Sequence, residues 1–138
     1  MSRLLVLLTL ILTATPSFAD KPFAPESIKG TTLISAEQLV EMIDTIPHLV
    51  IVDARRREEY VKGHIEGAVC ILDTEMTSTM LSKNVRSKEA PVVFYCNGER
   101  CMRSTNAVKK AVSWGYHRVY WFRGGWQEWN NKGLPVSQ

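Results

Sequence analysis

The sequence contains little cysteine, no long run of basic residues and only one long apolar stretch. Its three cysteines are an odd number, whereas a disulfide-framework domain usually carries a larger, even set, so we expect at least one free thiol. The formal net charge is only +3 at pH 7, and no basic run is long enough to indicate a nucleic-acid partner. The few clustered arginines favour a local anion-binding site instead.

The single long apolar stretch lies at the N-terminus and predicts a signal peptide over residues 1–19. Arg3 supplies a positive charge, residues 4–12 are apolar except for one threonine, and Ser17-Phe18-Ala19 offers a cleavage site with small residues. The run is shorter than the ~20 residues that a membrane span needs. An uncleaved anchor and a buried core helix are the alternatives. We expect a periplasmic or secreted protein with no membrane association after cleavage.

The rest of the chain predicts a single small α/β domain. Residues 20–30 contain two prolines and a glycine without periodic pattern, so we expect a flexible lead-in. Over residues 31–138, strand-like runs alternate with helix-like patterns, which indicates a mostly parallel central sheet flanked by helices on both faces. Thr31–Ile34 is predicted to be the first strand. Ser35 and Gln38 then form the capping-box pattern of a helix start.

A second strand is predicted over Leu49–Val52, which is continuously apolar and therefore typical of a strand covered on both faces. In parallel sheets the functional groups gather at the carboxyl ends of the strands. Asp53 and Arg55 follow this strand directly, so they are candidate site residues. The alternative is that Asp53 caps the turn that begins at Arg56, and the two roles are compatible.

Two further side chains have structural interpretations. His64 lies between two glycines and has no second histidine or carboxylate at metal-ligand spacing, so we expect it to anchor its loop rather than to bind a metal or act as a base. Cys70 lies in a predicted strand among apolar neighbours, which favours a small core residue over a reactive thiol. No metal site is predicted.

The strongest candidate for chemistry is Cys96. The apolar run from Pro91 to Tyr95 leads into this cysteine, a short polar loop follows, and a helix-like pattern begins near Ser104. A thiol with a pKa of about 8.5 is mostly protonated at neutral pH, although the thiolate is the nucleophile. A helix N-terminus and consecutive loop amides stabilise such an anion. This order of elements therefore predicts a cysteine nucleophile beside an anion-binding loop.

The loop after Cys96 supplies the candidate substrate-binding residues. Gly98 permits a nest of amides, while Arg100 and Arg103 add positive charge and forked donors for an oxyanion. Glu99 is expected to face solvent. The full predicted set is Asn97, Gly98, Glu99, Arg100, Cys101, Met102 and Arg103.

Cys101 is the unusual residue of this loop, because it lies five positions after Cys96. A disulfide between the two is possible if the loop folds back. A resolving or redox-regulatory thiol and a small packed residue are both consistent with the pattern. Two cysteines without further ligands form a poor zinc motif.

Three separated motifs resemble the rhodanese family, in the family's order and spacing. The resemblance extends from about Ile34 to Val136, nearly all of the chain after the predicted signal. The motifs are Val52-Asp53-Ala54-Arg55 with Glu59-Tyr60, Gly63-His64-Ile65 and Gly67-Ala68; Tyr95-Cys96-Asn97-Gly98 with Arg103-Ser104; and Tyr116 to Trp129 with Gly124-Gly125-Trp126.

The resemblance implies a small rhodanese-like domain with thiosulfate:cyanide sulfurtransferase-like activity and no metal or organic cofactor. Cys96 would take a sulfane sulfur as a persulfide and pass it to a thiophilic acceptor such as cyanide or a thiol. The implied partners are a small sulfur-containing anion and a thiol acceptor, with a protein thiol as one candidate acceptor. By the family pattern, the loop amides and Arg103 would hold thiosulfate or stabilise the persulfide, with Asp53, Arg55 and Ser104 in support.

The loop departs from the commonest family pattern, C-x-x-G-x-R-S. Either the loop is two residues longer, with Arg103-Ser104 as the usual pair, or Gly98-Glu99-Arg100 takes that part after a deletion. Related domains with longer loops act on phosphate or arsenate esters. Three hypotheses therefore remain open: a sulfurtransferase, a thiol redox or sulfur-carrier protein that uses Cys96 and Cys101, and a phosphatase-like or arsenate-reductase-like enzyme.

Overall fold

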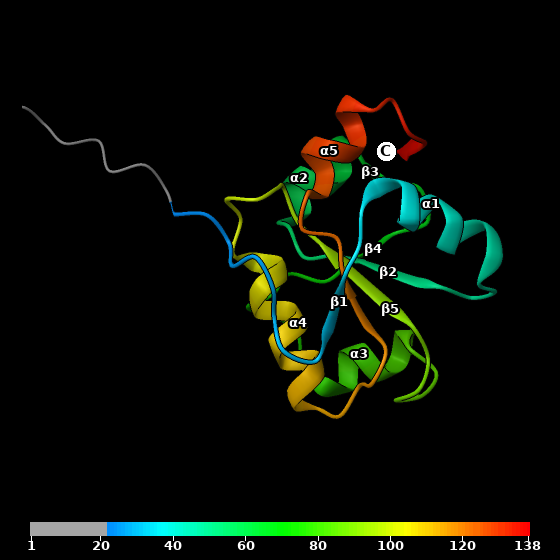
Figure 1. The fold of residues 1–138 in the computed structure, drawn as a ribbon, viewed down its shortest axis with the longest axis vertical. Coiled ribbons are helices and arrows are strands. Elements are labelled where there is room, and N and C mark those ends of the chain that lie inside the picture. Colours follow the sequence, from blue (N-terminus) through cyan, green and yellow to red (C-terminus); the bar gives the residue numbers. More distant parts are fainter. Residues whose placement is uncertain (1–21) are drawn as a thin grey trace, which may run out of the picture.

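The computed structural model describes residues 22–138, so the predicted signal peptide over 1–19 lies outside the described residues. Within this part of the chain, none of the helices has the length and apolar character required to cross a membrane. The elements alternate as predicted (Figure 1). The helices are α1 (Ala36–Thr45), α2 (Arg57–Lys62), α3 (Ser78–Asn84), α4 (Arg103–Ser113) and α5 (Gly125–Asn131).

The central element of residues 22–138 is a five-stranded sheet in the order β1-β6-β5-β2-β4, and every neighbouring pair is parallel. This confirms the predicted α/β class and the mostly parallel sheet. β5 is the central strand and ends at Tyr95, directly before Cys96. Its neighbour β2 ends at Asp53. The strands are β1 (Thr31–Leu33), β2 (Val50–Asp53), β4 (Val69–Cys70), β5 (Val92–Tyr95) and β6 (Val119–Trp121).

Helices cover both faces of this sheet, and the strand residues alternate between two apolar clusters. Figure 1 shows α3 and α4 on one side and α1 and α5 on the other. Val52 and Phe94 pack on the α3–α4 side, whereas Ile51, Val93 and Tyr95 pack on the α1–α5 side. Because both faces are buried, the strands need continuous apolar runs, which explains why these runs were visible in the sequence.

The predicted start of α1 is confirmed. Ser35 accepts a hydrogen bond from the Gln38 backbone N–H, and the Gln38 side chain accepts one from the Ser35 N–H. A second, antiparallel ribbon pairs β3 (His64–Ile65) with β7 (Val136–Ser137). β7 has no counterpart among the predicted strands, because two residues are too few to show a strand pattern.

The lead-in is packed on the domain over residues 22–30, which differs from the expected flexible segment. Ala24 and Ile28 are buried in the cluster on the α4 side of the sheet. The Ala24 N–H donates to the Glu99 carbonyl at 2.6 Å, and the Arg123 guanidinium donates to the Ala24 and Pro25 carbonyls, each at 2.9 Å. Only these two apolar residues are buried in a segment that is otherwise exposed and has no regular structure, so periodicity could not reveal them.

Candidate active site

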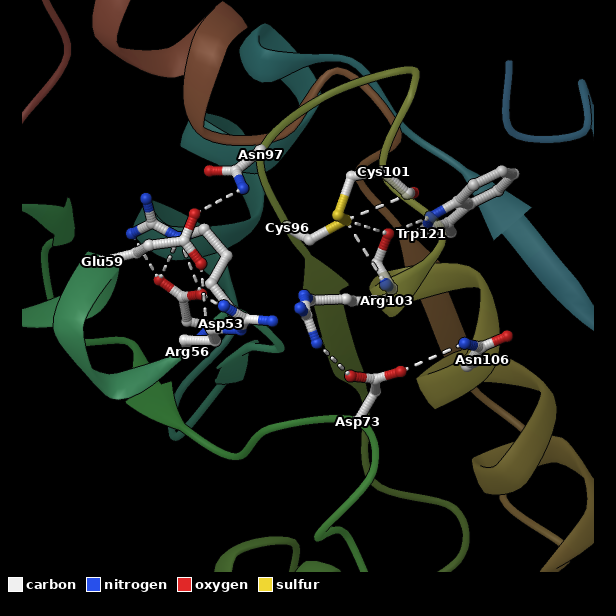
Figure 2. The surroundings of a disulfide bond; sticks show 12 residues. Asp53, Arg56, Glu59, Asp73, Cys96, Asn97, Cys101, Arg103, Asn106 and Trp121 are labelled. Carbon is white, nitrogen blue, oxygen red and sulfur yellow. Dashed lines mark hydrogen bonds and ion pairs between the residues drawn. A yellow bond between two sulfur atoms is a disulfide. The ribbon is translucent and has the colours of Figure 1, made fainter. Parts of the chain in front are cut away.

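Cys96 lies where the sequence predicted a nucleophile, at the carboxyl end of the central strand β5. Its side chain is only 1% exposed, and α4 begins seven residues later. Figure 2 shows the sulfur between Glu59 and Asn97 on one side and Arg103 and Asn106 of α4 on the other. The N-terminus of an α-helix carries a partial positive charge, so α4 favours a negatively charged group at this position.

The sulfur of Cys96 is held by Ser104, in the first turn of α4. The Ser104 backbone N lies 3.3 Å from the sulfur and its hydroxyl oxygen 3.1 Å away. Trp121 Nε1 donates to the same hydroxyl at 3.0 Å. A thiolate has no proton to donate and the indole already supplies one to the hydroxyl, so the Ser104 O–H is free to donate to the sulfur. The arrangement places two donors on the thiolate.

The structure pairs Cys96 and Cys101 in a disulfide, with 6.3 Å between their Cα atoms. This separation lies within the usual range of about 4.4–6.8 Å. A turn folds the loop back, since the Cys101 N–H donates to the Gly98 carbonyl at 3.0 Å. Cys101 is half-buried, whereas Cys96 beneath it is buried, and Cys70 is the free cysteine.

The first part of the loop is fixed by α5. The Trp126 N–H donates to the Cys96 carbonyl, and the Gln127 N–H donates to the Asn97 carbonyl, both at 2.8 Å. Gly125 has a φ of +58°, and a Cβ at this position would lie 2.3 Å from the Cys96 carbonyl oxygen. Only glycine fits this conformation and this close approach. The Gly124-Gly125-Trp126 motif therefore positions the nucleophile, although it does not contact the sulfur.

Glu59 of α2 fixes the loop from the opposite side. Its carboxylate accepts a hydrogen bond of 2.8 Å from the Asn97 side-chain amide. Burial by itself raises the pKa of Glu59, but the hydrogen bonds from Asn97 and from the Arg56 backbone outweigh it, so the pKa lies below its usual value. Glu59 is therefore an ionised acceptor at neutral pH.

Asp53 and Arg55 form a buried ion pair with 2.8 Å between Arg55 Nη2 and Asp53 Oδ2. Their side chains are 0% and 2% exposed. The Tyr95 hydroxyl donates to Asp53 at 2.6 Å, and Arg55 donates to the Gly63 carbonyl at 2.7 Å. The alternative that Asp53 caps α2 is wrong, because Arg56 is the N-cap and Asp53 is occupied by Arg55 and Tyr95. The pair is linked to Cys96 indirectly, through the adjacent Tyr95 and through Trp126, whose ring lies under the Arg55 guanidinium at 4.9 Å.

An open basin of about 1080 Å³ lies beside the loop. Three arginines and three carboxylates line it, together with other polar residues. Those charged residues are Arg56, Arg100, Arg103, Glu58, Glu59 and Asp73; the other lining residues include Asn97, Gly98, Cys101, Met102, Asn106 and Gln127.

The predicted anion-binding residues occupy different positions around this basin. Arg103 lies on the basin wall and pairs with the buried Asp73 at 3.2 Å. Arg100 lies over the ring of Phe23 at 4.0 Å. Glu99 faces solvent, as expected, and pairs with Arg123 at 3.2 Å. Of the two arginines predicted to bind an anion, Arg103 is therefore the one that lies beside Cys96, at the start of α4 (Figure 2).

Several basin residues were missed by sequence reasoning, namely Arg56, Glu59, Asp73, Asn106 and Gln127. Asp73 accepts hydrogen bonds from Arg103 and from the Asn106 amide, the latter at 3.0 Å. Asp73 follows a strand of only two residues and precedes a weakly patterned stretch, so no local sequence pattern indicated a role in the site. The Glu59-Tyr60 part of the first motif was the one available signal for Glu59.

His64 anchors its loop, in agreement with the structural interpretation. Its Nδ1 lies 2.8 Å from the Tyr60 carbonyl oxygen and its ring stacks on Tyr60 at 3.7 Å. Among residues 22–138, no group of three or more histidine, cysteine, aspartate or glutamate side chains is arranged to hold a metal ion.

The comparison with known families identifies the domain. The model of the Rhodanese-like domain matches residues 35–132, which include the Cys96 loop and all of α5. The chain belongs to the rhodanese family. Membership supports sulfurtransferase-type chemistry at the level of the family.

The rhodanese domain also has similar relatives of comparable length. It is 29% identical over 110 residues to the uncharacterized protein YibN of Escherichia coli K12, which is 79% of this chain and 72% of YibN. The crystal structure of BH2092 from Bacillus halodurans is 27% identical with a TM-score of 0.69, over 77% of this chain and 76% of that one. The polysulfide-sulfur transferase of Wolinella succinogenes has the same fold, with a TM-score of 0.64 and 21% identity over 78% and 79% of the chains.

The geometry distinguishes between the two alignments of the rhodanese loop. Ser104 contacts the Cys96 sulfur, whereas Arg100 lies over Phe23 at the far end of the loop. The geometry therefore favours the longer loop, with Arg103-Ser104 as the family's Arg-Ser pair. The two additional residues place Cys101 over the nucleophile.

We expect Ser104→Ala to slow the alkylation of Cys96 by iodoacetamide about tenfold in the reduced protein, because a hydrogen bond to a charged group contributes about 1.5 kcal/mol. The rate is measured by peptide mapping after reduction. Ser113→Ala is the matched control, since Ser113 lies on the exposed end of the same helix and bonds only the Lys110 carbonyl among the contacts seen. Equal Cys96 rates in both variants would show that the Ser104 hydroxyl does not hold the thiolate.

Cys70 is expected to react slowly despite being free. Burial raises the pKa of its thiol and the nearby Asp53 carboxylate raises it further. The reactive thiolate therefore forms only at higher pH than for an ordinary thiol. We expect its iodoacetamide rate to keep rising above about pH 8.5, the usual thiol pKa. A plateau below that pH in peptide mapping would contradict this prediction.

Proposed function

We propose that this rhodanese domain is a sulfurtransferase that moves a sulfane sulfur from a thiosulfate-type donor, through a persulfide on Cys96, to cyanide or a thiol. The observation that carries the proposal is the contact of the Cys96 sulfur with both donors of Ser104, at the N-terminus of α4. These donors stabilise the Cys96 thiolate, both as the attacking group and as the leaving group, without a metal or cofactor.

The chemistry requires a reduced Cys96. Its thiolate attacks the outer sulfur of thiosulfate, the sulfur–sulfur bond of the donor breaks, and sulfite leaves with the electron pair. Arg103 and Arg56 line the basin beside the loop and supply positive charge for the sulfonate group of the donor. The acceptor then attacks the outer sulfur of the persulfide, and the Cys96 thiolate is the leaving group.

The decisive assay is thiocyanate formation by the reduced protein from thiosulfate and cyanide, together with the mass of the protein after thiosulfate alone. The proposal expects thiocyanate and a gain of one sulfur on the Cys96 peptide. Absence of both with a correctly reduced protein would overturn it. Hydrolysis of an aryl phosphate by Cys96 would instead support the phosphatase-like alternative, which the longer loop motivates.

We also propose that the protein is exported to the periplasm or secreted, which the pattern over residues 1–19 supports. N-terminal sequencing of the protein from its native cells is expected to find Asp20 as the first residue. A protein that begins at Met1 or Ser2 in the cytoplasm would overturn this proposal.

A further inference from the structure

The second cysteine gives the loop a chemical possibility that sulfur transfer to cyanide does not use. We propose that Cys101 is a resolving nucleophile that expels the sulfane sulfur of the Cys96 persulfide as sulfide. The domain would then be a dithiol-dependent, sulfide-releasing reductase of thiosulfate-type donors. This inference rests on the proposed persulfide at Cys96 and extends it.

The position of Cys101 is the first support. Its sulfur is paired with the Cys96 sulfur in the structure, so the folded loop brings Cys101 onto Cys96. In a persulfide, the Cys96 sulfur is the inner sulfur, so it is the atom that the Cys101 thiolate reaches. The turn from Gly98 to Cys101 holds the loop folded back over the strand end.

The second support is the unequal exposure of the two cysteines. In the disulfide form Cys96 is 1% exposed and is absent from the wall of the basin, so an external thiol has poor access to its sulfur while the loop is folded back over it. Cys101 is half-buried and lines the basin. A group inside the protein attacks with a high effective concentration, whereas an external thiol must first diffuse to a covered atom.

The resolving step is balanced without an oxidant. The Cys101 thiolate attacks the inner sulfur, a bond forms between the two cysteine sulfurs, and the bond to the outer sulfur breaks. The outer sulfur leaves with the electron pair and is protonated to hydrosulfide. The sulfane sulfur is thereby reduced, and the two cysteines are oxidised to the disulfide that the structure contains.

Regeneration needs two electrons, which a dithiol reductant of small-molecule or protein type supplies. One of its thiolates attacks the accessible Cys101 sulfur, and the Cys96 thiolate leaves into its contacts with Ser104. A stabilised thiolate is the better leaving group in such an exchange. The second thiol of the reductant then releases Cys101. Overall, thiosulfate and the dithiol give sulfite, hydrosulfide, a proton and the oxidised reductant.

The test is a single turnover without any acceptor. The protein is reduced, freed of reductant under anaerobic conditions and given one equivalent of thiosulfate; released sulfide and protein mass are then measured. Wild-type protein and the control Cys70→Ser are expected to release one sulfide per chain and to lose two hydrogens as a Cys96–Cys101 disulfide. Cys101→Ser is expected to keep one sulfur on Cys96 and to release sulfide at least about 100-fold more slowly.

The other outcomes separate this inference from the proposed function. A stable Cys96 persulfide without sulfide release in the wild type would overturn the resolving role and leave the sulfurtransferase intact. An added sulfur that maps to Cys101 would also overturn it, because the outer sulfur would then have been attacked. Loading of neither wild type nor Cys101→Ser would overturn the proposed function and this inference with it.

Discussion

Replacing Cys96 by serine is expected to lower thiocyanate formation from thiosulfate and cyanide by at least about 1000-fold, as the loss of a catalytic nucleophile commonly does. The serine hydroxyl has nearly the same size, and Ser104 is in place to bond it. It fails because an alcohol is not ionised at neutral pH, and no general base contacts this position among the interactions seen. The measurement is the initial rate of thiocyanate formation by protein reduced immediately before the assay.

Cys70→Ser is the matched control for this variant, since Cys70 lies at the end of β4 and its thiol bonds the Arg55 carbonyl, away from the Cys96 loop. Its rate is expected to stay within a factor of two of the wild type. A Cys96→Ser variant that retains a tenth or more of the wild-type rate would show that sulfur transfer does not pass through Cys96. A loss in both serine variants would instead indicate damage to the fold.

The position of Cys96 between a central strand and a helix was predictable because its determinants are local in the sequence. Val92–Tyr95 is buried along its whole length, so its apolar run marks a central strand, and the polar loop and helix follow without interruption. Ser35 and Gln38 likewise mark a helix start with two residues three positions apart. Where both partners of an interaction lie within one turn or one strand, the pattern is visible without the fold.

The walls of the site depend on partners that are distant along the chain, and these were not predictable. Arg103 and Asp73 are 30 residues apart, and Asn97 and Glu59 are 38 apart. The Ala24 contact with Glu99 joins the lead-in to the loop with no local signal in either segment. Such pairs obey no spacing rule, because the fold rather than the local chain places them together. The sequence therefore located the strand end and the loop that carry Cys96, but not the basin beside them.

The disulfide was predictable only in part. The spacing of Cys96 and Cys101 permitted a bond, but a resolving thiol and a small packed residue remained equally consistent with the sequence. The decisive information is the turn at Gly98, which folds the loop over the strand end. Its direction depends on the contacts of Trp126 and Gln127 with the loop carbonyls, which come from an element thirty residues further along the chain.

Asp53→Ala is expected to lower the free energy of unfolding by about 3–5 kcal/mol, the usual cost of removing one partner from a buried ion pair. The variant leaves the Arg55 guanidinium, 2% exposed, without its counter-charge and removes the acceptor of the Tyr95 hydroxyl. Burial by itself lowers the pKa of Arg55, but the Asp53 carboxylate outweighs this and raises the pKa, so Arg55 is charged in the folded protein. A loss of this size is a large fraction of the about 5–15 kcal/mol that stabilises a typical domain.

The measurement is the urea midpoint of unfolding, with Glu37→Gln as the control because Glu37 pairs with Lys132 on the surface and its loss is expected to leave the midpoint unchanged. The double variant Asp53→Leu with Arg55→Met discriminates the cause. If an uncompensated buried charge is responsible, replacing both partners by apolar side chains recovers much of the lost stability.

If the double variant is as unstable as Asp53→Ala, the hydrogen bonds to Tyr95 and Gly63 stabilise this strand end, and the charge pair does not. Because Tyr95 precedes Cys96, either outcome also shows what holds the nucleophile's strand in place.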